Sequence, residues 1–260
     1  MCKQLIDAHI HLDMYEEPDR SRLIQELGNS SVQALISVSN NLASSYRQLK
    51  LAQLDSRIKP AIGYHPEQAL PEEEEIQSIL QLIDDNRNQI IAIGEVGLPY
   101  YLRQETPGLE LKPYVELLER FIQKSATCDF PIVLHAVYED AEVVCGLLEK
   151  HQVAHAHFHW FKGSDRVLER ILSNGYVVSV TPDVTYKPKI HSIVKQTPLS
   201  QLMVETDGPW PFEGRFTGEM TSPAMMHDSV QSIAKLKGME LGETYRQLYE
   251  TTKAFYRIKA

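Results

Sequence analysis

His9 and His11 end an apolar segment near the start of the chain, in the sequence LIDAHIHLD, and Asp7 and Asp13 flank them. Residues 5–9 have the composition of a strand, and residues i and i+2 of a strand point to the same face. Two imidazoles on one face at the carboxyl end of a strand form half of a metal site when other strands supply further ligands. The alternative is a pair of surface histidines, and this segment alone leaves both interpretations open.

Further imidazoles and carboxylates stand at the ends of other strand-like segments. They are His65 in GYHP, Glu95 in GEVG, His135 in PIVLH, His159 in HAHFH, and Glu205 and Asp207 in ETDGPW. Imidazoles mixed with carboxylates, without thiolates, suit Zn, Mn, Fe, Co or Mg and exclude a structural zinc site of the cysteine type. The pattern therefore predicts a metal centre with ligands from several strands.

Glu95 lies at the middle of this candidate ligand set. A carboxylate can bridge two cations, which an imidazole cannot, so Glu95 would allow a binuclear centre. Two cations about 3.5–4 Å apart activate water and hold the attacking and leaving oxygens of a phosphoester. Asp207 could hold one cation and also accept the proton of the attacking water.

Several other histidines are expected to lie outside the site. His155, His157 and His159 alternate on one strand face, and only the last is near enough to the carboxyl end to reach a site there. His157 is predicted to be packed or hydrogen-bonded, and His155 to lie near the start of the strand. His191 and His227 occur in helix-like segments and are expected at the surface.

The elements that must position these residues alternate along the chain. Strand-like segments are 5–9, 34–39, 58–63, 90–96, 131–135, 154–159, 175–181 and 202–206, and helix-like segments include 43–55, 72–86, 111–128, 139–151 and 164–175. Such alternation is typical of parallel strands with helical crossovers. We predict one α/β domain over residues 1–260, a (β/α)8 barrel, with an open doubly wound sheet as the alternative. Both architectures place chemistry at the carboxyl ends of strands.

Composition and charge restrict further which kind of protein this can be. The 260 residues are 43% hydrophobic, with no signal-peptide pattern and no apolar run approaching the roughly 20 residues that cross a bilayer. Three cysteines, Cys2, Cys128 and Cys145, argue against a disulfide framework, so a cytoplasmic location is expected. A net charge of −9 without a basic stripe argues against an extended duplex-binding surface. A monomer is the expectation for a self-contained barrel.

The ordered motifs resemble those of the TatD family of metal-dependent hydrolases, over nearly the whole chain. They are DAHIHLD, GYHP, AIGEVGL, PIVLH, HWFKGS, VETDGPW and the final IAKLKG…TTKAFYRI. The resemblance implies a distorted (β/α)8 barrel like that of amidohydrolases, and a divalent-metal phosphodiesterase that acts on DNA ends or single strands.

The resemblance also implies roles for matched residues. His9, His11, Glu95 and Asp207 would hold one divalent ion (Mg, Mn or Zn), and Glu95, His135 and His159 the second, with Glu95 bridging and Asp207 and Glu95 in the catalytic machinery. His65 would lie on the substrate side. Departures from the family pattern fall around the substrate: Val137 replaces a common arginine, Pro99 an aspartate and Glu67 a histidine, and GEMTSPAMM replaces a basic stretch after the last strand.

These observations support three hypotheses of different kinds. The leading one is a metal-dependent phosphodiesterase that trims nucleic-acid ends or single-stranded DNA. The second keeps the metals but changes the bond to an amide, lactone or aminoacyl ester, because guanidinium groups that would grip phosphate are missing. The third is a non-catalytic binding protein, which the complete candidate ligand set disfavours.

Overall fold

The strands form one sheet around which the chain winds in sequence order. The computed structural model describes residues 3–259. Its sheet has eight strands in the order β1 to β8, and each pairs in parallel with the next. The strands are β1 (Leu5–Ile10), β2 (Val32–Val38), β3 (Ile58–Ile62), β4 (Ala92–Gly97), β5 (Ile132–His135), β6 (Ala156–Phe158), β7 (Val177–Val180) and β8 (Leu202–Val204).

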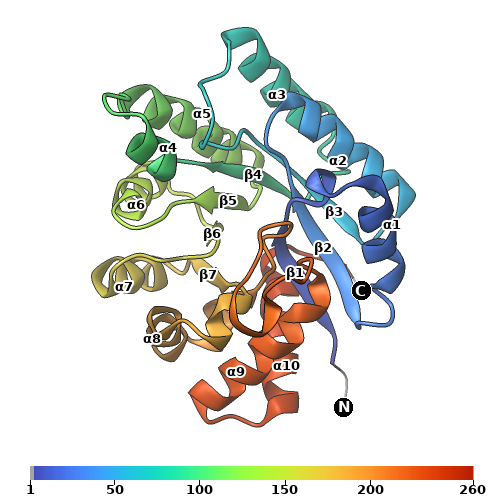
Figure 1. Ribbon diagram of the computed structural model, residues 1–260. Coiled ribbons are helices and arrows are strands. Elements are labelled where there is room, and N and C mark those ends of the chain that lie inside the picture. Colours follow the sequence, from blue (N-terminus) through green and yellow to red (C-terminus); the bar gives the residue numbers. More distant parts are fainter. Residues whose placement is uncertain (1–2, 260) are drawn as a thin grey trace.

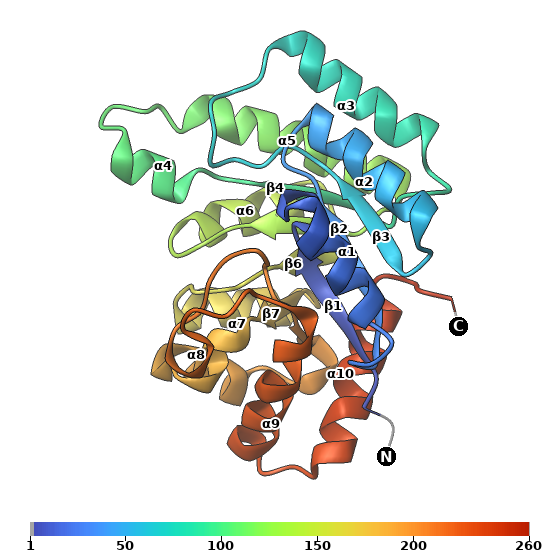
Figure 2. The same cartoon turned by 45° about the vertical axis from the view of Figure 1, so that its right-hand side comes forward.

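The helices surround this sheet, as Figures 1 and 2 show. They are α1 (Glu17–Glu26), α2 (Leu42–Leu54), α3 (Glu73–Asp85), α4 (Tyr100–Glu105), α5 (Lys112–Cys128), α6 (Asp140–Lys150), α7 (Asp165–Ser173), α8 (Pro188–Gln196), α9 (Met226–Lys237) and α10 (Leu241–Phe255). The helices α9 and α10 follow the last strand and lie below the barrel in Figure 1. No helix in the described part of the chain is long and apolar enough to cross a membrane.

Local sequence explains where the helices begin and which face they bury. The side chain of Ser164 accepts a hydrogen bond from Val167 N at the start of α7, which satisfies one of the free N–H groups of the first turn. Leu168 and Ile171 of the same helix are buried, at the spacing that keeps one helical face against the sheet. Asn41 caps α2 in the same way, through Ser44 N.

Two apolar layers show that the sheet curls into a barrel. The interior layer contains small and branched side chains from alternate strand positions, such as Ala8, Ala34, Ala61 and Ala92, together with Val133. The larger layer lies between the outer face of the strands and the helices. This arrangement confirms the predicted (β/α)8 barrel and excludes the open doubly wound sheet, because an open sheet has no enclosed face of this kind.

The barrel closes between its first and last strands without a regular ladder. Within residues 3–259 no β1–β8 strand pairing is present, and we call this junction the seam. Two backbone hydrogen bonds cross it just beyond β8: Asp207 N donates to His9 O at 2.9 Å, and His11 N donates to Gly208 O at 2.8 Å. Tyr256, after α10, also donates from its hydroxyl to Ala8 O at 3.1 Å.

Register shifts in β1 and β4 change which side chains face inward. In β1 the pairing with β2 shifts between Asp7 and Ile10, and in β4 the pairing with β5 shifts between Ile93 and Val96. Ile6 and Ala8 face the interior, so strict alternation would turn His9 outward. A bulge redirects the side chains that follow it. The shifts therefore allow His9 and Glu95 to point into the barrel mouth.

Candidate metal centre

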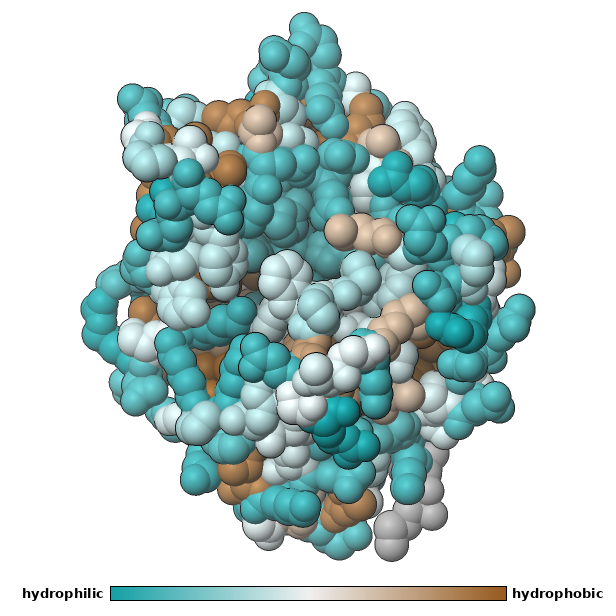
Figure 3. All heavy atoms as spheres, in the orientation of Figure 1, coloured by the Kyte–Doolittle hydropathy of each residue, from teal (hydrophilic) through white to brown (hydrophobic). Residues whose placement is uncertain are grey.

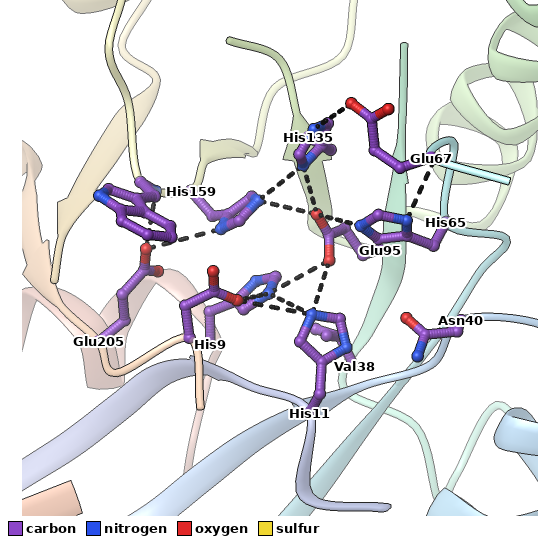
Figure 4. Close-up of polar contacts among 12 residues, drawn as sticks. His9, His11, Val38, Asn40, His65, Glu67, Glu95, His135, His159 and Glu205 are labelled. Carbon is purple, nitrogen blue, oxygen red and sulfur yellow. Dashed lines mark hydrogen bonds and ion pairs between the residues drawn. The ribbon is translucent and has the colours of Figure 1, made fainter. Parts of the chain in front are cut away.

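Six side chains from the ends of five strands meet in one cluster, most of which is labelled in Figure 4. They are His9 (β1), His11 (just after β1), Glu95 (β4), His135 (β5), His159 (just after β6) and Asp207 (after β8). All six are buried. The structure thus brings together every residue predicted to be a ligand, although the first and last lie at opposite ends of the sequence.

One oxygen of Glu95 faces the imidazoles of β1. Its Oε2 lies 3.2 Å from His9 Nε2 and 3.1 Å from His11 Nε2. Asp207 Oδ1 lies 3.3 and 3.5 Å from the same two nitrogens, which are 3.3 Å apart. Four potential ligand atoms therefore surround one point.

The other oxygen of Glu95 faces a second pair of imidazoles. Its Oε1 lies 3.0 Å from His135 Nδ1 and 2.8 Å from His159 Nε2, and these two nitrogens are 3.3 Å apart. The ring of His159 also stacks on that of His9, with centroids 3.9 Å apart. The two groups are therefore adjacent and share the Glu95 carboxylate.

The separations test whether these atoms suit a cation. Two ligands at about 2.0–2.2 Å from one ion, at angles of about 90–109°, are about 2.8–3.6 Å apart. Every separation above falls in that range. Glu95 Oε2 is buried and receives no hydrogen bond from any residue between 3 and 259, despite its two nearby nitrogens. Lone pairs that converge on a common centre explain both observations, so these residues are able to bind metal.

The buried charges of the cluster shift one another's pKa values. Burial alone would raise the pKa of Glu95, but the surrounding imidazoles hold that pKa well below its usual value. Burial would lower the pKa of His11 and of His135, yet the neighbouring carboxylates raise both to about 9. Without a cation the cluster therefore holds protons at neutral pH, because only protonated imidazoles can balance its two buried carboxylates.

His65, predicted on the substrate side, lies beside the cluster with a different hydrogen-bonding role. Its Nδ1 accepts from Glu67 N at 3.2 Å, which leaves the proton of a neutral ring on Nε2. That Nε2 is 3.5 Å from Glu95 Oε1. Burial lowers the pKa of His65, so the ring is neutral at physiological pH, and its Nε2–H faces the Glu95 carboxylate.

Glu67 makes a contact that its position in the sequence did not predict. Its Oε1 accepts from His135 Nε2 at 3.0 Å, across 68 residues of sequence (Figure 4). The same carboxylate accepts from Tyr101 N at 2.9 Å and Leu102 N at 2.7 Å at the start of α4. Glu67 therefore holds a proton on His135 Nε2, so Nδ1 is the nitrogen that would lose its proton and face a cation.

Acidic residues that were candidates on position alone have supporting roles. Asp7 accepts from His9 N at 3.2 Å and from Thr206 N at 3.0 Å, so it ties the two sides of the seam beneath the cluster. Glu205 Oε1 accepts from Trp160 N at 2.7 Å and lies 3.6 Å from His159 Nδ1. These carboxylates orient the histidine-bearing segments.

The remaining histidines lie where the alternation and helical positions suggested, with one difference. His157 is fully buried and bonded to Tyr256 and Ser179, and His155 precedes β6. His191 and His227 lie on helices away from the cluster but are only partly exposed, because each makes hydrogen bonds to neighbouring groups. The surface expectation for these two was therefore only partly right.

The molecule is hollowed near the centre of the face shown in Figure 3, and the surface around the hollow is mostly hydrophilic. A (β/α)8 barrel whose strand ends hold a cluster of imidazoles and carboxylates able to bind metal defines a class, the metal-dependent hydrolases.

Comparison with known proteins places the chain within that class. The sequence pattern described as TatD related DNase matches residues 6–257. The chain belongs to the TatD family of metal-dependent hydrolases.

Individual relatives cover almost the same length. An uncharacterized metal-dependent hydrolase of Haemophilus influenzae is 38% identical, over 98% of this chain and 100% of its own. The human deoxyribonuclease TATDN3 is 25% identical, over 92% of this chain and 89% of its own. The crystal structure of the TatD homologue YjjV from Escherichia coli superposes with a TM-score of 0.90 at 22% identity, over 99% of each chain. This last likeness supports the fold.

Proposed function

We propose that this protein is a cytoplasmic, monomeric phosphodiesterase that uses two divalent cations to release nucleotides from DNA ends or single strands. The observation that carries the proposal is the division of the Glu95 carboxylate between two groups of ligand atoms. Its Oε2 lies beside His9 and His11, which Asp207 also contacts, while its Oε1 lies beside His135 and His159.

The proposed ligand assignment follows from that division. His9, His11 and Asp207 would hold one cation, His135 and His159 would hold the other, and Glu95 would offer one oxygen to each. Mg, Mn and Zn all accept this mixture of nitrogen and oxygen ligands. A bound pair of cations supplies an activated water and positive charge opposite the phosphate oxygens.

The side chains of the protein then position the substrate and transfer protons. Asp207 uses Oδ1 for its contacts with His9 and His11, whereas Oδ2 makes no hydrogen bond to any residue between 3 and 259. Burial would raise the pKa of Asp207, but His11 and His9 hold that pKa far below its usual value. The ionised Oδ2 is therefore available to accept the proton of the attacking water. His65 carries its proton on Nε2, and in the proposed function this N–H would donate to a non-bridging oxygen of the substrate.

Support for DNA as the substrate comes from the family and from the relative named deoxyribonuclease TATDN3. Support for ends or single strands comes from the charge of −9, because long duplexes are gripped by basic surfaces. Cys128 and Cys145 are unpaired, in keeping with a reducing compartment, and Cys2 lies outside the described residues.

The test uses protein stripped with a chelator and reloaded with Mg, Mn or Zn. End-labelled single-stranded DNA is the substrate, and nucleotide release is followed by gel and by chromatography. We expect metal-dependent release that falls by about 100-fold or more in Glu95→Gln, because one buried carboxylate supports both ions. His151→Gln, which lies on Glu119 far from the cluster, serves as the matched control and should leave release unchanged.

A carbonyl substrate is the competing candidate. Val137 is buried and apolar just beyond β5. It stands where an arginine of the resembling family would contact phosphate, and this favours a less charged substrate. A panel of aryl esters, lactones and amides run beside a chromogenic phosphodiester separates the two. Turnover of a carbonyl substrate without phosphodiester turnover would replace the nuclease proposal and keep the metal centre.

A further inference from the structure

Lys162 has a half-buried ammonium group that no carboxylate of residues 3–259 contacts. Across residues 3–259, no carboxylate oxygen lies within 4.0 Å of its Nζ, and its one hydrogen bond, 3.4 Å long, is to the hydroxyl of Tyr101. Burial lowers the pKa of Lys162 to about 8. The charges of Asp183, Asp207 and Glu205 offset this burial in part, without contacting the ammonium group. A half-buried cation that no carboxylate contacts favours the binding of an anion.

The loop after β6 holds Lys162 rigidly. Trp160 N is bonded to Glu205 and its indole Nε1 to Asp183 Oδ2 at 2.8 Å, so the ring has a fixed orientation. Phe161 is fully buried, which anchors the next residue. The Nζ of Lys162 lies 3.5 Å from the centroid of the Trp160 ring, a close cation–π contact. The ammonium group is therefore preorganised.

This position borders the candidate metal centre from two sides. Trp160 directly follows His159, and the ring of Tyr101 lies 6.1 Å from that of His135. Lys162 Nζ lies between these two neighbours of the cluster, near the tyrosine hydroxyl and over the indole. An anion that reached both the cluster and Lys162 would have its charge neutralised at two adjacent points.

An exposed aromatic surface adjoins the same indole. The ring of Trp210 lies 6.3 Å from that of Trp160, and 59% of Trp210 is exposed. Tyr101, on the other side of Lys162, is 39% exposed. Exposed aromatic faces next to a cation are the combination that binds single-stranded nucleic acids, in which bases stack and phosphates are neutralised.

We propose that Lys162 and Trp210 form a nucleotide subsite beside the metal cluster, in which Lys162 binds the phosphate next to the cleaved one and Trp210 stacks on its base. The inference rests on the proposed function, because it assigns the part of the substrate that the cluster does not hold. It names a single-stranded nucleotide unit as the ligand, since a duplex keeps its bases stacked on each other.

The test compares three variants with the wild type. Lys162→Met keeps the length of the side chain and removes its charge, Lys162→Arg keeps the charge, and Trp210→Ala removes the stacking surface. Lys253→Met is the matched control, because this lysine also lies over an aromatic ring, Tyr249, but on α10. Circular dichroism and thermal melting confirm that each variant is folded.

Two readouts are used. Fluorescence anisotropy of chelator-stripped protein measures binding of a labelled oligothymidylate and of a matching abasic deoxyribose-phosphate strand. Steady-state kinetics of the metal-loaded protein separate KM from kcat. We expect Lys162→Met to weaken binding of both strands and to raise KM by about 10-fold with a smaller change in kcat, and Lys162→Arg to restore most of the loss. Trp210→Ala should weaken only the base-bearing strand, by about 10-fold.

The outcomes separate this inference from the proposed function. If Lys162→Met binds both strands as well as Lys253→Met does, and the wild type cleaves DNA, the subsite is overturned and the nuclease proposal stands. If Lys162→Met loses strand binding, and the wild type releases no nucleotide with any metal, the subsite stands and the nuclease proposal is overturned. Equal weakening of both strands by Trp210→Ala overturns the stacking role.

Discussion

Glu67 offers the sharpest test of how the metal centre is held. Its Oε1 accepts from His135 Nε2 at 3.0 Å, and its two oxygens also receive two backbone N–H groups of α4. Replacement by alanine leaves His135 without its acceptor, so the ring can rotate or carry its proton on Nδ1, the atom directed at Glu95. We therefore expect Glu67→Ala to weaken the binding of one cation, the one assigned to His135 and His159, and to leave the other nearly unchanged.

The magnitude follows from the hydrogen bond that the alanine cannot make. Removal of a hydrogen-bond partner behind a metal ligand typically costs about 10–100-fold in metal affinity, which corresponds to about 1.4–2.7 kcal/mol. Glu67→Gln keeps an oxygen that can accept from His135 but turns an amide NH2 toward Leu102 N–H. We expect Glu67→Gln to lose less metal affinity, about 3–10-fold, because only the charge and one hydrogen bond to the helix are removed.

The assay is a competition titration of chelator-stripped protein with zinc and a chromogenic chelator, which resolves two binding steps. Nitrogen-15 NMR of the imidazoles reports the tautomer of His135 independently of activity. Glu119→Gln is the matched control, since Glu119 also contacts a histidine, His151, at 2.6 Å and lies far from the cluster. Wild-type affinity for both ions together with an unchanged His135 tautomer in Glu67→Ala would refute the reasoning, as would an equal loss in both steps.

Other consequences of the structure can be measured as well. The pKa values of His11 and His135 are raised to about 9, so a cation must displace protons when it binds. Apparent metal affinity should therefore rise between pH 7 and 9 by up to about 10-fold per pH unit for each proton released. Calorimetry in buffers of different ionisation enthalpy measures the proton release, and a metal affinity independent of pH contradicts the prediction. The same raised values mean that the folded metal-free protein binds more protons than the unfolded chain, so its free energy of unfolding should decrease as pH rises from 7 through 9, as urea denaturation can show. Gly97→Ala would press a methyl group into the backbone oxygen of His135, so we expect a loss of about 3 kcal/mol or failure to fold; a denaturation midpoint equal to that of the wild type would show that β4 and β5 can separate. Asp207→Asn should lower turnover by about 100-fold or more while the fold persists, and unchanged turnover would remove Asp207 from the proton transfer.

The sequence alone predicted the alternation of strands and helices and the convergence of the six side chains, for a physical reason. Carboxyl ends of parallel strands share one edge, so a histidine or acid that ends a strand is placed by the alternation of elements without knowledge of its partners. His159 was separated from His157 by the same argument, and the structure places the first in the cluster and the second on Tyr256 and Ser179.

What remained unpredicted depends on contacts between distant segments. The register shifts in β1 and β4 have no local signature in LIDAHI or AIGEVG, because a bulge arises from how neighbouring strands pair. The bond between Glu67 and His135 joins residues that no periodicity relates. In the sequence Lys162 is one lysine among many, and only the packing of Trp160 and Tyr101 distinguishes it.

The seam gives the metal centre a role in holding the molecule together. His9 and His11 belong to the first strand and its end, and Asp207 follows the last strand. One cation shared by all three would join the two ends of the sheet, between which residues 3–259 form no regular strand pairing. We expect amides of the first and last strands to exchange with deuterium more slowly in the loaded protein, and the intermediate strands to change little. Because the three ligands come from both ends of the chain, a newly synthesised chain could bind this ion only after its last strand has docked. Activity would therefore appear only in the completely folded barrel.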